Sequence, residues 1–288
     1  MRRNEPMTAA PDRYAVLGNP VAHSRSPFIH AEFARQTGQH IDYTRVLCAM
    51  DGFAQAVRDF AHAGARGCNV TVPFKFEAPA LAQRVSPRAA LAQAANVLRF
   101  DADGWLADNS DGIGLVRDLQ GDGGVALQGS RVLLIGAGGA AAGVLGPLLD
   151  ARPSALHVVN RTPHKAAALV ARHAALAASR GVALTAAGLD DAGAAYDVVL
   201  NASASSLGGV AAPVSGHVLR PGTLAVDLMY GAAAQPFMAW AAAHAALPRD
   251  GLGMLVEQAA EAFLLWRGVM PNTAPVLQRL RRQLDAER

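Results

Sequence analysis

The chain has 288 residues, of which 51% are hydrophobic and 17% are charged, with a formal net charge of +3. This composition predicts a folded chain long enough for two domains, and excludes a disordered one. No basic run is interleaved with aromatic residues, which argues against a nucleic-acid partner, and no apolar stretch reaches the ~18 residues of a membrane span. Cys48 and Cys68 lack metal-ligand or redox spacing, so we expect no metal site, two buried free thiols and a cytoplasmic location.

Strand and helix patterns alternate in the first third of the chain. Strand patterns occupy residues 13–20, 41–48, 65–73 and 97–100, and helix patterns occupy 26–38, 51–64 and the stretch from Ser86 onward. Ser26 is placed as the N-cap of its helix, with Pro27 at the first helical position. The alternation predicts an α/β unit with a mostly parallel sheet.

The stretch "NVTVPFK" places a lysine just beyond a predicted strand. Polar and apolar residues alternate from Asn69 to Val72, which predicts one polar face, and Pro73 cannot continue the ladder. A solvated surface residue is the ordinary interpretation of Lys75. The functional interpretation is that Lys75 acts beside Asn69 and Thr71, whose side chains point the same way.

A second α/β unit begins at "GSRVLLIGAGGAAAG". Gly136, Gly138 and Ala141 follow the pattern G-x-G-x-x-A between an apolar strand and a helix, which is typical of a loop that approaches a pyrophosphate. Further strand patterns lie at 155–160, 181–187, 196–203 and 222–230. A loop at 247–253 then precedes an amphipathic helix at 253–268. These elements predict a doubly wound dinucleotide-binding fold.

The end of the second strand in this unit distinguishes between nicotinamide cofactors. NAD sites commonly place an acidic residue there, whereas a basic residue accommodates the 2′-phosphate of NADP. Here Asn160 occupies the position of the acid, and Arg161 and Lys165 follow. The sequence therefore predicts NADP, because a guanidinium binds phosphate and a carboxylate would repel it.

A nicotinamide enzyme that oxidises an alcohol also needs a group that exchanges the hydroxyl proton. Lys75 is one candidate, and Asp111, in "DNSDG" at the junction of the two units, is the other. On position alone, Asp111 is equally well explained as a helix N-cap. The two residues together would form a proton-handling pair in a cleft.

Six motifs resemble the shikimate dehydrogenase family, which reduces 3-dehydroshikimate with NADPH in aromatic amino-acid biosynthesis. They are "YAVLGNPVAHSRSP", "NVTVPFK", "DNSDG", "LLIGAGGAAAGV", "VVNRT" and "GLGMLVEQAAEAFLLW", and they span the chain from Tyr14 onward. The resemblance implies a substrate-binding α/β domain at 12–110 and 252–288, with the C-terminal helices returning to it. It also implies a Rossmann-type NADP-binding domain at 111–251.

The resemblance also implies a role for each matching residue. Lys75 and Asp111 would be catalytic, with the division of proton transfer between them left open. Substrate would be bound by Ser24, Ser26, Asn69, Thr71, Asn96, Tyr230 and Gln258. The serines would bind the carboxylate of shikimate or 3-dehydroshikimate. The cofactor would be bound by Gly136, Ala137, Gly138, Gly139, Ala140, Asn160, Arg161, Thr162, Lys165, Ser203 and Gly253.

Some positions depart from the family pattern, and two rival functions stay open. Val97 stands where threonine is common, which affects secondary substrate contacts and not the reaction, and Ser203 is a modest change from another threonine. The Gly-rich loop lacks its frequent arginine and Lys165 replaces a second arginine, so NADP affinity is expected to be lower. One rival is a quinate/shikimate dehydrogenase of broader range, and the other is a catalytically silent NADP-binding sensor. The oligomeric state is open, with a homodimer as a candidate.

Overall fold

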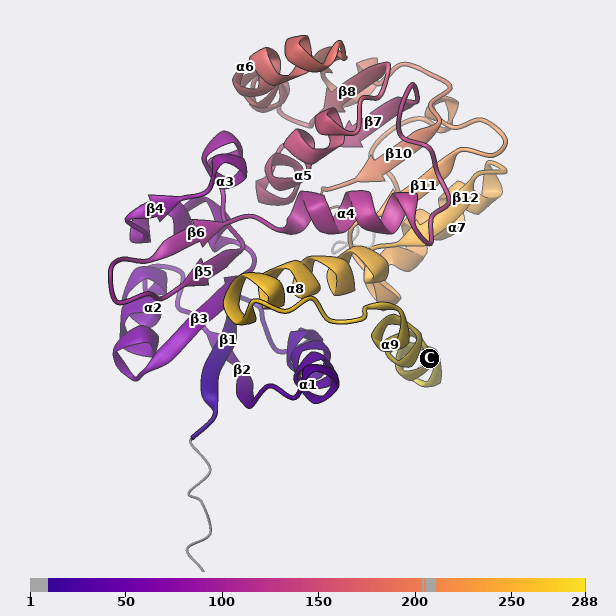
Figure 1. Cartoon of the computed structure of the whole chain (residues 1–288). Helices are drawn as coiled ribbons and strands as arrows, with labels where there is room; N and C mark the ends of the chain where they lie inside the picture. The colour runs from indigo at the N-terminus through magenta and orange to yellow at the C-terminus, as the bar shows by residue number, and fades with distance from the viewer. Residues whose placement is uncertain (1–9, 204, 206–210, 288) are drawn as a thin grey trace, which may run out of the picture.

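The computed structural model describes residues 10–203, 205 and 211–287, which form two six-stranded sheets with helices around them (Figure 1). The first sheet has the strand order β2-β1-β3-β5-β6-β4. Its strands are β1 (Asp12–Gly18), β2 (Ile41–Leu47), β3 (Ala65–Val70), β4 (Arg84–Val85), β5 (Val97–Arg99) and β6 (Leu106–Asp108). The helices connected with this sheet are α1 (Ser26–Thr37), α2 (Phe53–His62) and α3 (Pro87–Ala92).

The first sheet is mostly parallel, as predicted, but β5 runs antiparallel to both β3 and β6. The strand predicted at 65–73 ends earlier, at Val70. Beyond it, the backbone N–H of Phe74 donates to the carbonyl of Thr71 and closes a turn, so the chain has left the ladder before Pro73. Strands β4 and β6 were not predicted, because two or three residues carry no readable alternation.

The second sheet is parallel throughout, with the strand order β12-β11-β10-β7-β8-β9. Its strands are β7 (Arg131–Ile135), β8 (Ala155–Val159), β9 (Ala183–Ala187), β10 (Val198–Asn201), β11 (Leu224–Asp227) and β12 (Leu247–Asp250). Helices α5 (Gly139–Asp150), α6 (Pro163–Arg180) and α7 (Gln235–Ala243) connect them. This is the doubly wound order expected for a dinucleotide-binding fold, and the predicted α/β class is confirmed.

The loop predicted at 247–253 was wrong. Residues 247–250 form β12, which pairs with β11 at the edge of the second sheet. Its sequence, Leu-Pro-Arg-Asp, contains a proline and two charged residues, which an edge strand tolerates and a buried strand does not. Of the remaining three residues, Gly251 is the N-cap of the following helix, and Leu252 and Gly253 are its first residues.

The burial of strand β7 shows that the second sheet has an apolar core on each face. Four consecutive residues of β7 are fully buried, and they divide alternately between two apolar clusters: Val132 and Leu134 in one, Leu133 and Ile135 in the other. A continuous apolar run is the pattern of a strand that helices cover on both sides. The chain can therefore hold the loop after Ile135 rigidly at the carboxyl end of the sheet.

Two long helices, α4 (Asp111–Gln120) and α8 (Leu252–Arg267), lie between the two sheets (Figure 1). Helix α8 shares an apolar cluster with α1 and with the C-terminal helix α9 (Ala274–Ala286), through side chains such as Phe33, Phe263 and Leu280. The C-terminal helices therefore return to the first sheet, as predicted. Within the described residues, no helix is both long and apolar enough to cross a membrane.

Candidate active site

Lys75 lies in a single 3₁₀ turn, Phe74–Phe76, immediately after β3. Phe74 anchors this turn, because its ring is fully buried and stacks on Phe53 with centroids 4.6 Å apart. The Lys75 side chain is only 13% exposed, and its Nζ donates to Asp111 Oδ2 over 2.6 Å. The structure thus brings together the lysine and the aspartate that the sequence singled out, 36 residues apart.

Asp111 is the first residue of α4, and its carboxylate is 5% exposed. Its second oxygen, Oδ1, accepts a hydrogen bond from Asn96 Nδ2 over 2.8 Å, and its backbone N–H donates to Asn109 Oδ1. A carboxylate in the first turn of a helix is also favoured by the helix dipole. Asp111 does not cap its own helix, since the N-cap residue is Ser110. Both oxygens of Asp111 are therefore oriented, one toward a cation and one toward an amide.

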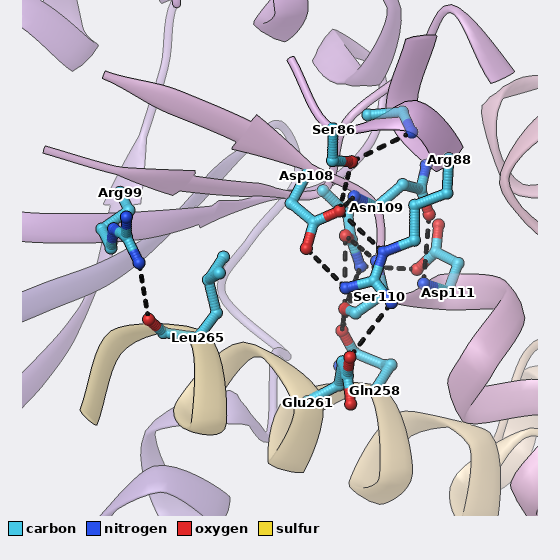
Figure 2. Close-up of polar contacts among 12 residues, drawn as sticks. Ser86, Arg88, Arg99, Asp108, Asn109, Ser110, Asp111, Gln258, Glu261 and Leu265 are labelled. Atoms are coloured by element: carbon cyan, nitrogen blue, oxygen red, sulfur yellow. Dashed lines mark hydrogen bonds and ion pairs between the residues drawn. The ribbon is translucent and has the colours of Figure 1, made fainter. Parts of the chain in front are cut away.

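An amide cluster of Asn96, Ser110 and Gln258 adjoins Asp111, and Figure 2 shows Asp111 with Ser110 and Gln258. Asn96 Nδ2 also donates to Ser110 Oγ over 3.0 Å and to Gln258 Oε1 over 3.1 Å, while Asn96 Oδ1 accepts from the backbone N–H of Ser110. Asn96, just before β5, and Gln258, on α8, are predicted substrate-binding residues; Asn96 contacts Asp111 directly, and Gln258 contacts Asn96. Ser110 was missed as a member of the site, although the motif "DNSDG" contains it.

Asn69 is held by Tyr43, a residue that no motif in the sequence marks. Tyr43 Oη donates to Asn69 Oδ1 over 2.6 Å, and Asn69 Nδ2 donates to the carbonyl of Asn96 over 3.1 Å. Burial raises the pKa of Tyr43 well above its usual value, so its hydroxyl stays a donor at neutral pH. Tyr43 occupies an ordinary position in β2, and only the tertiary structure reveals its contact.

The serine pair lies at the start of α1, and Tyr230 follows the end of β11. Ser24 Oγ donates to Ser26 Oγ over 3.2 Å, and the guanidinium of Arg45 donates to the Ser24 carbonyl over 2.9 and 2.6 Å. The N-cap predicted at Ser26 was wrong: Ser26 is the first helical residue, and Arg25 precedes it without a side-chain cap. Burial raises the pKa of Tyr230. In the described part of the chain, neither Ser24 nor Tyr230 hydrogen-bonds with Lys75 or Asp111.

Thr71 packs against Gly18 at the end of β1. A Cβ at Gly18 would lie 2.3 Å from Thr71 Cγ2, so the glycine gives this side chain its room. Thr71 also extends the pairing beyond β3, because its backbone N–H donates to the carbonyl of Leu17 over 2.9 Å. The residue predicted to bind substrate is therefore fixed by the neighbouring strand.

The Gly-rich loop connects β7 with α5 and fits a dinucleotide. Gly136 has φ of +115°, a conformation that favours glycine, and a Cβ there would lie 2.9 Å from the carbonyl oxygen of Ala202. By contrast, a Cβ at Gly138 would meet nothing within 4 Å, so the backbone at the start of α5 is open. Helix α5 has no side-chain cap, which leaves its first N–H groups for an anion. Ala137, Gly139 and Ala140 complete this turn.

Basic side chains follow β8, where an acid would stand in an NAD site. Arg161 and Lys165 are exposed, and neither makes an ion pair or a side-chain hydrogen bond with another described residue. Asn160 Nδ2 donates to the carbonyl of Thr162 over 3.0 Å, which fixes the loop between them. This arrangement leaves two cations available for a phosphate group and places no carboxylate at position 160.

Two other predicted cofactor residues have clear structural partners. Ser203 Oγ donates to Asn201 Oδ1 over 2.7 Å, at the end of β10. Gly253 lies where α8 meets α4, and a Cβ there would approach Asp118 Oδ1 to 1.9 Å. Close helix packing therefore explains the glycine at 253 without a cofactor.

The lysine and the Gly-rich loop come into contact. A Cβ at Gly139 would lie 3.1 Å from Lys75 Cβ, so the alkyl chain of Lys75 rests against the first residue of α5.

A cavity of about 650 Å³ between α3, α4, α5 and α6 contains none of the predicted site residues, and we do not assign it to the reaction. Among the described residues, no group of three or more His, Cys, Asp or Glu side chains could hold a metal ion.

Three family models match the chain. They are described as the shikimate dehydrogenase substrate binding domain over residues 16–98, shikimate / quinate 5-dehydrogenase over 120–226, and the shikimate 5'-dehydrogenase C-terminal domain over 251–281. The chain is also 64% identical over 283 residues to a protein of Methylibium petroleiphilum named shikimate dehydrogenase (NADP(+)), and the match covers 96% of each chain.

Two solved structures are similar along almost the whole chain. An Ael1 enzyme from Pseudomonas putida has 44% identity and a TM-score of 0.85, covering 93% of this chain and 98% of that one. Shikimate 5-dehydrogenase from Thermus thermophilus, in complex with NADP(H) and shikimate, has 29% identity and a TM-score of 0.80, covering 94% and 99%. The similarity thus includes both sheets and the helices between them.

Proposed function

This chain belongs to the shikimate dehydrogenase family, and on that premise we propose that it catalyses the NADPH-dependent, reversible reduction of 3-dehydroshikimate to shikimate. The observation that carries the proposal is the Lys75–Asp111 pair, with 2.6 Å between Nζ and Oδ2, next to the Gly-rich loop. The chain is accordingly an oxidoreductase of aromatic amino-acid biosynthesis.

The chemistry divides between the cofactor and the side chains. NADPH, when bound, supplies the hydride that reduces the C3 carbonyl. Lys75 and Asp111 handle the proton that the carbonyl oxygen gains in reduction, or that the hydroxyl loses in oxidation. A lysine ammonium has three donors, so Lys75 can hydrogen-bond both Asp111 and the substrate oxygen.

The remaining polar residues are assigned to the substrate and the cofactor. Asn96 contacts both Asp111 and Gln258, which supports a role for the two amides in binding substrate hydroxyls, together with Asn69 and Thr71. Ser24 and Ser26 are assigned to the carboxylate, and Tyr230 to the edge of the substrate. The Gly-rich loop is assigned to the pyrophosphate, and Arg161 with Lys165 to the 2′-phosphate.

We also propose how the chain is divided. Residues 12–110 and 252–288 would form the substrate-binding domain, and 111–251 the NADP-binding domain. The apolar clusters around β1 and β3 and around β7 and β10 support this division, and a third cluster also takes in Ala92, Ala94 and Met254 where the two domains meet. Cys48 and Cys68 are buried free thiols, which is compatible with a cytoplasmic protein. A homodimer is the candidate assembly, and light scattering can test it.

The proposal is tested by initial rates for shikimate and quinate, each with NADP and with NAD. We expect turnover largely confined to shikimate with NADP. Comparable rates with quinate or NAD would instead identify the quinate/shikimate dehydrogenase of broader range. Folded protein that binds NADP and turns over no substrate would identify a silent sensor.

A further inference from the structure

Four charged side chains form an ion network next to the amide cluster, and Figure 2 shows Arg88, Asp108 and Glu261 of this network. They are Arg88 on α3, Asp108 at the end of β6, Arg117 on α4 and Glu261 on α8. Arg88 Nε donates to Asp108 Oδ1 over 2.7 Å, and Arg88 Nη1 donates to Glu261 Oε1 over 3.0 Å. Arg117 Nη2 lies 2.9 Å from Glu261 Oε2. The network therefore joins four elements of the fold at one point.

Glu261 is the centre of this network. Its side chain is 13% exposed, and its two oxygens face arginines from two different helices. The contact with Arg117 is ionic and lacks hydrogen-bond alignment, since Glu261 Oε2 has no hydrogen-bond partner among the described residues. A shielded carboxylate between two guanidinium groups is strongly oriented, because leaving either charge unpaired is costly. Glu261 thereby limits how α8 can rotate or slide.

Asp108 connects the same network with the catalytic pair. Burial alone would raise the pKa of Asp108, but hydrogen bonds from Arg88 and Ser86 outweigh it and lower the pKa, so the carboxylate stays charged. Its Oδ1 also accepts the backbone N–H of Asn109 over 2.8 Å, and Asn109 in turn contacts Asp111. The ion network is thus anchored on the strand end that precedes Asp111.

Gln258 lies one turn before Glu261 on α8, so the two side chains share a face of the helix. Gln258 Oε1 accepts from Asn96 Nδ2, and Glu261 accepts from Arg88, at neighbouring points along that face. Any shift of α8 moves both contacts together. The register fixed by Glu261 is therefore also the register that presents Gln258 to the site.

We infer that Glu261 is a positioning residue: held by Arg88 and Arg117, it sets α8 so that Gln258 meets a hydroxyl of the substrate. The inference rests on the proposed function and deepens it, because it assigns substrate affinity to a side chain outside the site. A purely structural role for Glu261 would affect stability without a selective effect on shikimate.

The test is Glu261→Gln, which keeps the shape and removes the charge. We expect the KM for shikimate to rise about tenfold, the effect of losing one well-placed contact, with kcat and the KM for NADP within about twofold. Glu257→Gln is the matched control, since it makes the same change on α8 at a residue without an ion pair in the described structure. This control should leave all three constants unchanged.

A double-mutant cycle separates positioning from general damage. In a Gln258→Ala background, Glu261→Gln should raise the KM for shikimate no further, because the side chain it positions is gone. An unchanged KM in the single variant would overturn the inference. A tenfold rise that persists in the Gln258→Ala background would overturn it as well.

A second variant covers the case in which Glu261→Gln does not fold. Arg117 is 38% exposed and lines the cavity of about 650 Å³, so water reaches it and Arg117→Gln should be tolerated. We expect this variant to raise the KM for shikimate about threefold, and an unchanged KM would overturn the inference. If the wild-type protein did not turn over shikimate at all, the proposed function would be contradicted instead. Calorimetric titration with shikimate would then still test the inference, which predicts weaker shikimate binding by Glu261→Gln than by the wild type.

Discussion

Arg161 is exposed just before α6, with no partner among the described residues that would compete for a phosphate. We predict that Arg161→Ala raises the KM for NADP about tenfold, because one charge-assisted contact is lost. The KM for NAD, which has no 2′-phosphate, should change less than twofold. Equal losses for the two cofactors, measured by initial rates, would contradict the assignment of Arg161 to that phosphate.

His30 makes the stability of the protein depend on pH. Its ring is fully buried, stacks on Tyr43 with centroids 4.2 Å apart, and has no hydrogen-bond partner among the described residues. Burial lowers the pKa of His30 to about 3, and the neighbouring Asn69 side chain opposes this shift without reversing it. The unfolded chain therefore takes up a proton below the ordinary histidine pKa of 6.5, and the folded chain does so only near pH 3.

The stability that neutral His30 contributes is complete above pH 6.5 and declines as the pH falls toward 3. The decline is about 1.4 kcal/mol per pH unit, or roughly 2 kcal/mol between pH 6.5 and 5. We predict that His30→Phe, which keeps a ring in the cluster, loses less stability between pH 7 and 5 than the wild type. Urea unfolding at the two pH values measures this difference, and equal losses would show that His30 is not the titrating group.

Single residues of the site were predictable where a motif carries them. "NVTVPFK" and "DNSDG" identified Lys75 and Asp111, and the structure brings them together, although their catalytic roles remain a proposal. Tyr43, Arg88 and Glu261 were not predictable in the same way. Each lies in a regular strand or helix and acquires its partner from a segment at least 20 residues away, so no local pattern marks it.

At the scale of elements, the contact between α4 and α8 depends on a missing side chain. A Cβ at Gly114 would lie 2.6 Å from the backbone nitrogen of Gln258, and backbone cannot move aside as a side chain can. A helical Gly→Ala change normally stabilises a helix by up to ~1 kcal/mol. We predict that Gly114→Ala instead destabilises the protein by about 1–3 kcal/mol and raises the KM for shikimate, because it pushes α8 and Gln258 away.

Gly146→Ala on α5 is the control for this prediction. A Cβ there would meet the tip of Leu91, 3.3 Å away, and the tip of Leu176, 4.0 Å away, and flexible side chains can relieve such contacts. Its free energy of unfolding should stay within about 1 kcal/mol of the wild type. If denaturant unfolding gave the same small change for Gly114→Ala, the close approach of α4 and α8 would not constrain the site.

Long elements with a clear pattern were predicted, and short or polar ones were not. The strand β7, the Gly-rich turn and α5 follow from a buried apolar run and the glycines after it. β4, β6 and β12 were missed because they are short or lie at a polar edge, where pairing depends on the neighbouring strand and not on their own sequence. No residue range was predicted for α4, α7 or α9.

At the scale of the whole molecule, the site is assembled from segments far apart in the sequence. Lys75 follows β3, Asn96 precedes β5, Asp111 opens α4, and Gln258 comes from α8, which returns between the two sheets (Figure 1). The family resemblance implied that these segments meet, while the pattern of strands and helices alone did not. The ion network around Glu261 adds that the returning helix is fixed by charge as well as by apolar packing.

The central claim is that Lys75 and Asp111 handle the proton during NADP-dependent oxidation of shikimate. The most direct test is the kcat of Asp111→Asn, which keeps the shape of the side chain and removes the charge beside Lys75. Asp103→Asn is the matched control, since the Asp103 side chain is 78% exposed and belongs to no proposed site. We predict that kcat falls at least about 100-fold in Asp111→Asn and is unchanged in the control, with both proteins folded by circular dichroism. A folded Asp111→Asn enzyme with near wild-type kcat would contradict the account.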